Sequence, residues 1–167
     1  RSIQGRRRAR PCGAENPNSM RLKFHTQTAG HMLTRRQPEN NIIRITLQAL
    51  AAVLGGTQSL HTNSWDEAHA IPSEQAVRIA VRTQQIIAEE SGVTNTVDPL
   101  AGSYYIESLT NKIEDGVLDY LSQIETLGGV IPTVESGFFQ REIIKTSHER
   151  QRRIDSGEEV VNGVNKY

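Results

Sequence analysis

The sequence has little cysteine, few aromatic residues and no long apolar run. Cys12 is the single cysteine among 167 residues, which excludes a disulfide-stabilised scaffold and a cysteine-based zinc site. No stretch reaches the roughly 18 consecutive apolar residues that a membrane-spanning helix requires. The start of the sequence lacks the apolar core of a signal peptide. We therefore expect one cytoplasmic domain of ordinary size, with no bound metal and no membrane partner.

Positive and negative charges balance, with 19 Lys and Arg side chains against 19 Asp and Glu. The net charge therefore gives no argument for an acidic substrate or a nucleic acid as partner. Residues 1–10 nevertheless carry five arginines and no acidic residue. We predict that residues 1–12 form a disordered basic head. A nucleic-acid patch is the functional alternative for this head, but no aromatic residue is interleaved for base stacking, so we favour a solvated tail.

The remaining residues alternate between short strand patterns and amphipathic helix patterns. Strands are predicted at 21–27 and 57–62, and helices at 39–54, 74–90, 106–127 and 138–156. The first of these helices has an apolar stripe made by Ile43, Leu47, Leu50 and Leu54. Helices that alternate with strands predict βαβ crossovers and a parallel sheet. Two or three strands are too few for an independent parallel sheet, so the sequence predicts part of a larger α/β structure.

Individual residues mark where these elements begin and end. Ser73 is a suitable N-cap for the helix that follows it, and Gly128-Gly129 ends the long third helix. A further strand is predicted at 130–134, although Pro132 weakens it. The last residues, 160–167, are expected to be extended.

Neutral polar residues gather at the ends of both predicted strands. One cluster occupies 24–30, and the other occupies 57–63 and continues into Trp65, Asp66 and Glu67. Because function in parallel α/β proteins lies at the carboxyl ends of the strands, both clusters are candidate ligand contacts. Capping of the following helices is the structural alternative. The sequence contains neither a phosphate-binding loop nor a catalytic triad signature, so the pattern alone indicates a ligand-binding face.

The same clusters carry a family resemblance. From about Gly13 to the last residue, the sequence closely resembles the catalytic barrel of the methylmalonyl-CoA mutase family. The resemblance rests on Phe24-His-Thr-Gln-Thr-Ala-Gly30, Asn40-Asn41, Gln48 to Asn63, Thr83 to Ala88, Val97 to Tyr105, Glu135-Ser-Gly137 and Gly163-Val-Asn-Lys-Tyr167. It implies that residues 13–167 are the C-terminal strands and helices of a (β/α)8 TIM barrel with the linker that follows.

The resemblance also implies a chemistry. Members of this family use adenosylcobalamin to interconvert methylmalonyl-CoA and succinyl-CoA by a radical rearrangement. The cofactor carries the radical chemistry, while the protein positions groups and excludes water. This requirement agrees with the neutral character of the two clusters, because a radical step needs no strong base.

The resemblance assigns catalytic and substrate-binding roles. Gln27 matches a glutamine near the substrate and the adenosyl group, and His25 lies on the same strand face by the period-2 alternation of side chains. These two residues are the candidate catalytic residues. Gln58 and Ser59 match positions that contact the CoA ester.

Two further residues match the family's contacts to the adenosyl ribose. These are Asn63 and Glu67, whose spacing of four is compatible with one turn of helix that would bring them to one face. Asn18 matches a position that is often basic in the family and contacts CoA, so the change weakens that contact.

The chain also departs from the family pattern. It contains no Asp-x-His, so the corrin-binding motif is missing, and the early barrel strands that bind the substrate carboxylate are missing as well. We therefore expect a fragment that is inactive alone. Its expected partners are an acyl-CoA, a cobalamin-binding domain or subunit, and other mutase chains. An isobutyryl-CoA or ethylmalonyl-CoA mutase, or a non-catalytic remnant or subunit that pairs with mutase chains, are the alternatives.

Overall fold

The computed structural model describes residues 15–19, 21 and 23–167. Within it the chain divides into two compact units, Arg1–Leu100 and Ala101–Tyr167. The predicted basic head at 1–12 lies outside the described residues, as does Leu22 of the predicted first strand.

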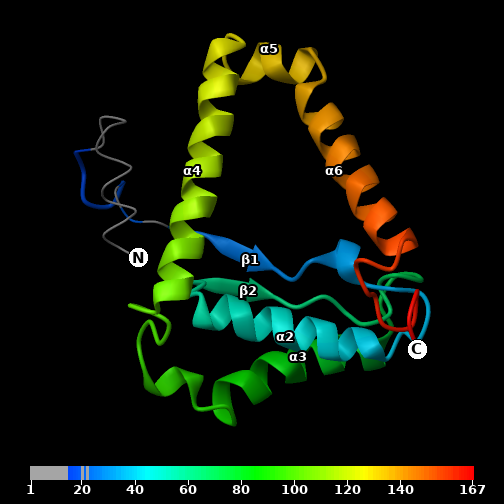
Figure 1. Ribbon diagram of the computed structural model, residues 1–167. Coiled ribbons are helices and arrows are strands. Elements are labelled where there is room, and N and C mark those ends of the chain that lie inside the picture. Colours follow the sequence, from blue (N-terminus) through cyan, green and yellow to red (C-terminus); the bar gives the residue numbers. More distant parts are fainter. Residues whose placement is uncertain (1–14, 20, 22) are drawn as a thin grey trace. The chain divides into compact units, whose positions relative to one another are not determined.

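The first unit consists of a two-stranded parallel sheet and two helices (Figure 1). Strand β1 (His25–Gln27) precedes helix α2 (Asn40–Leu54), and strand β2 (Ser59–His61) precedes helix α3 (Glu74–Glu89). Single 3-10 turns lie at Gly30–Met32 and Val93–Asn95. The parallel pairing of β1 with β2 around α2 confirms the predicted βαβ order. Both strands are shorter than predicted, and the full eight-stranded barrel stays a prediction.

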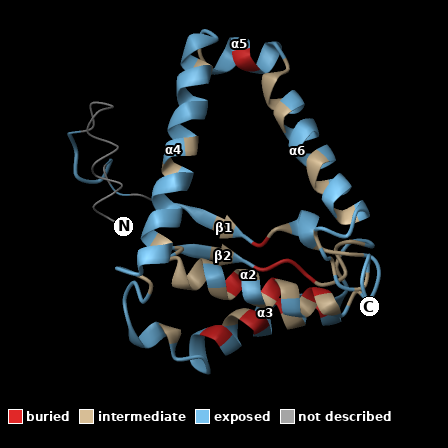
Figure 2. Ribbon diagram, viewed as in Figure 1, coloured by how far each residue is buried: buried red, intermediate tan, exposed pale blue. Residues whose placement is uncertain are grey.

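The core of this unit lies between the two helices and one face of the sheet. Figure 2 shows the buried residues of α2 and α3 in red, and they are Asn41, Ile45, Ala49, Ala76, Ala80, Thr83 and Ile87. The predicted apolar stripe of α2 is only partly right, because Ile43 and Leu47 are 61% and 63% exposed. The packed face of α2 instead carries an asparagine and an alanine, which a hydrophobic pattern does not select.

The predicted start of α3 is confirmed. The Ala76 backbone N–H donates to the Ser73 Oγ over 3.3 Å, so the hydroxyl caps the first turn. Helix α2 ends at Leu54, the predicted last residue, and the Gly55-Gly56 pair follows it. Gly56 has a φ of 76°, which glycine adopts without strain.

The second unit is helical. It contains α4 (Tyr104–Thr126), α5 (Val130–Glu135) and α6 (Phe138–Asp155), and neither α4 nor α6 has a buried residue. The predicted strand at 130–134 is wrong, because this segment is the short helix α5. Pro132 lies in its first turn, where a helix tolerates the missing N–H. The Thr133 hydroxyl, fully buried, donates to the Gly129 carbonyl over 2.6 Å and anchors the helix.

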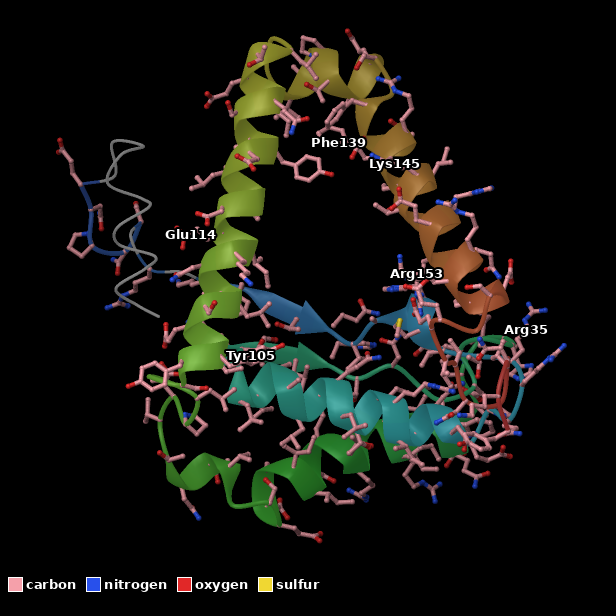
Figure 3. All side chains as sticks on the ribbon, viewed as in Figure 1. Arg35, Tyr105, Glu114, Phe139, Lys145 and Arg153 are labelled. Atoms are coloured by element: carbon pink, nitrogen blue, oxygen red, sulfur yellow. The ribbon has the colours of Figure 1, made fainter. Side chains whose placement is uncertain are left out.

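The last residues are turned rather than extended, so that prediction is wrong too. Asn165 accepts from the Val161 N–H over 2.7 Å and donates to the carbonyls of Ile154 and Glu159. Glu159 in turn pairs with Arg150 and with Arg153, which Figure 3 labels near the end of α6. These polar contacts fold the tail back on α6, whereas the sequence shows only a polar stretch without period.

Candidate functional site

One face of the two-stranded sheet is open and polar. In register, His25 lies opposite Ser59, and Gln27 lies opposite His61. These four side chains share one face, and each residue is exposed. Between them, Thr26 and Leu60 point to the other face and are partly buried. The predicted alternation is confirmed, since it places His25 and Gln27 together.

The two strands are joined on this face by a side-chain hydrogen bond. The His25 Nδ1 and the Ser59 Oγ lie 2.7 Å apart. The Gln58 side chain contacts the backbone instead, because its Oε1 accepts from the Phe24 N–H over 3.1 Å. Gln58 therefore ties the amino ends of the strands together, and its NH2 group forms no hydrogen bond within the described residues.

The carboxyl ends of the strands meet at Asn63. Its Oδ1 accepts from the Gln27 Nε2 and from the Thr28 Oγ1, each over 3.1 Å. The Thr28 hydroxyl also accepts from the Asn63 N–H over 2.9 Å. Asn63 is only 2% exposed, so this small network fixes the Gln27 amide at the edge of the open face.

Gly30 packs closely against this network. A Cβ added at Gly30 would lie 2.9 Å from the Asn63 Nδ2. Since Asn63 is buried and held by three hydrogen bonds, it has little freedom to move away. The absence of a side chain at Gly30 is thus a requirement of the site.

Glu67 lies in a turn rather than in a helix. Its Oε1 accepts from the Ser64 N–H over 2.6 Å, and its own N–H donates to the Ser64 carbonyl over 3.2 Å. The expected helical turn from Asn63 to Glu67 is therefore wrong. Both residues nevertheless belong to the same loop after β2, and the second carboxylate oxygen of Glu67 forms no hydrogen bond within the described residues.

An asparagine that the sequence interpretation left without a role holds this loop in place. Asn41 is fully buried on α2, accepts from the Thr34 N–H, and donates to the carbonyls of Thr34 and Trp65 over 2.9 Å each. A second contact to the loop comes from Arg35, labelled in Figure 3, whose Nε donates to the Ala68 carbonyl over 2.8 Å. No signal in the sequence marked Asn41 as inward-facing, because the predicted stripe of this helix ran through Ile43 and Leu47.

Asp66 has a pKa below its ordinary value. Burial acts to raise the pKa and is the largest influence, but hydrogen bonds from the Ser73 backbone and side chain, with the nearby His69, outweigh it. The Ser73 N–H donates to the Asp66 Oδ2 over 2.9 Å. The Asp66 carboxylate thus connects the loop to the start of α3.

The lowered pKa predicts a loss of stability in acid. Because the folded pKa lies below the unfolded one, the Asp66 carboxylate stabilises the unit above the unfolded pKa, and this stability is lost as the pH falls through the folded pKa. Between about pH 5 and pH 2 the melting temperature should fall more steeply for the wild type than for Asp66→Asn. The fluorescence of Trp65, the single tryptophan, follows unfolding at each pH and gives the melting temperature. The exposed Glu89→Gln is the control, and a wild-type slope equal to that of Asp66→Asn would contradict the assignment.

A hollow of about 230 Å³ lies beside the first residues of β2. Gln58 and Ser59 contribute to its wall, and most of the remaining lining is apolar, from Val53, Leu60, Ile87 and Ala88. The two predicted substrate contacts therefore border a surface that suits the alkyl part of a ligand.

Comparison with known proteins decides the family. The methylmalonyl-CoA mutase family model matches residues 3–167. The chain belongs to the methylmalonyl-CoA mutase family. The match begins ten residues before Gly13, where the resemblance of the motifs begins.

Relatives within the mutase family are about half identical to the chain. The chain is 54% identical over 155 residues to the 2-hydroxyisobutanoyl-CoA mutase large subunit of Aquincola tertiaricarbonis, covering 93% of the chain and 28% of that protein. It is 52% identical over 155 residues to the methylmalonyl-CoA mutase of Escherichia coli K12, covering 93% of the chain and 22% of that enzyme. It is 49% identical over 153 residues to the human mitochondrial methylmalonyl-CoA mutase, covering 92% of the chain and 20% of that enzyme. The chain thus spans between 20% and 28% of the length of these relatives.

The site of this mutase-family chain contains uncharged hydrogen-bonding groups at its centre. Among the described residues, no three His, Cys, Asp or Glu side chains lie close enough to hold a metal ion. No helix in the described ranges is long and apolar enough to cross a membrane. The predicted cytoplasmic location stays a prediction. Asn18, the predicted CoA contact, donates its N–H to the Asn16 Oδ1 over 2.8 Å and lies in an exposed turn seven residues before β1.

Proposed function

We propose that the chain forms part of the catalytic barrel of an adenosylcobalamin-dependent mutase that interconverts methylmalonyl-CoA and succinyl-CoA. The observation that carries the proposal is the open face of β1 and β2, where His25, Gln27, Ser59 and His61 lie together at the meeting of two parallel strands. Membership of the mutase family supplies the reaction class. A radical rearrangement needs positioned, uncharged hydrogen-bonding groups rather than paired carboxylates.

The roles proposed for the substrate contacts follow from the hydrogen bonds. Ser59 and His25 are joined over 2.7 Å and present a fixed pair to the CoA ester. Gln27 is held at its Nε2 by Asn63, so its carbonyl oxygen is positioned toward the reacting group. Gln58 offers its NH2 group to the ester beside the apolar hollow.

The two proposed cofactor contacts differ in how well they fit a ribose. Adenosylcobalamin supplies the radical chemistry when it is bound. Glu67 fits well, because one carboxylate oxygen caps the loop and the other is uncommitted within the described residues. Asn63 fits only as a donor, since its Oδ1 already accepts two hydrogen bonds. We propose that Glu67 contacts a ribose hydroxyl directly and that Asn63 holds Gln27 in place beside it.

Turnover is proposed to belong to a larger assembly. The chain spans 28% or less of the relatives described above, and one of these is named a large subunit. A cobalamin-binding domain or subunit and further mutase chain are therefore the proposed partners. The isolated chain is proposed to bind an acyl-CoA without converting it.

A second CoA ester is proposed as an alternative substrate, because one relative is named for it. The relative named 2-hydroxyisobutanoyl-CoA mutase is 54% identical to the chain, against 52% for the methylmalonyl-CoA mutase of E. coli. This small difference does not separate the two CoA esters, so both belong in the same binding experiment.

Ligand-dependent melting tests the proposed function. Succinyl-CoA at a hundredfold excess over its Kd should stabilise the folded chain by about 2.7 kcal/mol, because it binds only the native state. The measurement is a near-UV circular dichroism melt with succinyl-CoA, 2-hydroxyisobutanoyl-CoA or no ligand. Ser59→Ala should remove most of the shift, while Ser147→Ala, an exposed serine of α6, should keep it. A melt that neither CoA ester raises would overturn the proposal.

A further inference from the structure

His61 is the one residue of the open face to which the family resemblance assigns no role. It ends β2, lies in register with Gln27, and is exposed on the same face as His25 and Ser59. The three other side chains of this face each form a hydrogen bond, His25 with Ser59 and Gln27 with Asn63. The His61 imidazole forms none within the described residues.

The position of His61 along β2 places it between two groups of proposed contacts. Ser59 lies two residues before it and Asn63 two residues after it. At about 3.3 Å per residue, each is about 6.6 Å away along the chain. The substrate contacts thus precede His61 and the cofactor contacts follow it, so His61 lies where the substrate and the adenosyl group must meet.

A histidine ring has two nitrogens that can form hydrogen bonds, and neither nitrogen of His61 has a partner within the described residues. The acyl end of a CoA ester presents a thioester carbonyl and, in succinyl-CoA, a carboxylate, and both accept hydrogen bonds. One N–H of the Gln27 amide is bound to Asn63, which fixes the position of that side chain beside these oxygens. The His61 ring, which forms no hydrogen bond within the described residues, can donate to an acyl oxygen.

We propose that His61 is a specificity-determining residue that hydrogen-bonds the acyl group of the CoA ester and sets its position at the reacting end of the site. This inference rests on the proposed function. It predicts that His61 distinguishes an acylated CoA from free CoA, whereas Ser59 and Gln58 bind the part that both share.

Histidine-ring NMR of the wild-type chain tests the inference without altering the site. The chain has five histidines, which single substitutions assign. Succinyl-CoA should shift the ring resonances of both His25 and His61, and free CoA should shift His25 but leave His61 nearly unchanged. His148, exposed on α6 in the second unit, is the internal control and should not move with either ligand.

Affinity provides the second measurement. His61→Ala should weaken succinyl-CoA binding about tenfold, the effect of one lost hydrogen bond, and should change free CoA binding by less than about threefold. His61→Gln should restore most of the affinity because it keeps a donor, and His148→Ala should match the wild type.

The outcomes separate the inference from the proposed function. If succinyl-CoA binds and shifts His25 while His61 stays unmoved, the inference is overturned and the proposed function stands. Equal loss of succinyl-CoA and free CoA affinity in His61→Ala also overturns it. If neither ligand binds the chain, the proposed function fails and the inference fails with it.

Discussion

Asn41→Ala is expected to lower the free energy of unfolding of the first unit by about 3 kcal/mol. The substitution leaves the Thr34 N–H, the Thr34 carbonyl and the Trp65 carbonyl without their partner at a fully buried position. A buried polar group without a partner costs about 1 to 3 kcal/mol, and partial access of water moderates the sum. Urea unfolding followed by Trp65 fluorescence measures the loss directly, because Asn41 binds the backbone of that residue.

The neighbouring asparagine provides a matched control for this experiment. The Asn40 side chain donates to the exposed Gln37 side chain over 2.8 Å. Asn40→Ala should therefore shift the urea midpoint much less, by the equivalent of about 0.5 kcal/mol. Equal midpoints for the two variants would mean that the Asn41 contacts contribute nothing beyond an exposed amide.

Gly30→Ala is expected to destabilise the first unit by about 1 to 3 kcal/mol and to displace the Asn63 side chain. The added Cβ would lie 2.9 Å from the Asn63 Nδ2, closer than atoms pack. Movement of Asn63 releases its hold on Gln27 and Thr28, so the effect reaches the open face. A thermal melt gives the stability change, and the side-chain NH2 resonance of Asn63 gives the displacement.

A glycine in open space gives the control of opposite sign. Gly116 lies inside α4, and a Cβ there would meet nothing within 4 Å. Gly116→Ala should raise the stability of its helix by about 1 kcal/mol, since alanine favours helix over glycine. A Gly30→Ala protein that melts like the wild type, with the Asn63 resonance unmoved, would refute the close packing.

Local patterns were enough to predict much of the first unit. The Ser73 cap, the end of α2 at its glycine pair and the shared face of His25 and Gln27 all depend on neighbours in sequence. The His25–Ser59 hydrogen bond was not predicted, because the register between two strands is set by tertiary packing and not by either strand alone. For the same reason the inward face of Asn41 could not be distinguished from a surface position.

The second unit shows where patterns are ambiguous. The segment 130–134 contains four β-branched residues, so it resembles a strand, yet it forms α5 between two glycine turns. A run this short carries no decisive period. The turned tail depends on the side chain of Asn165, whose three partners lie 4 to 11 residues away and are not marked by any local motif.

The spacing of the site's contacts in the chain has a consequence for folding. The bonds that join the β1 segment to the β2 segment link residues 31 to 36 positions apart, from Thr26 with Thr57 to Gln27 with Asn63. All of these bonds require the same loop of chain to close. The conformational entropy lost in closing the loop is therefore a cost that arises once for the whole set. The site therefore forms cooperatively, with its contacts appearing together. We expect these contacts to form after helix α2, because the helix must first bring the two strand segments side by side.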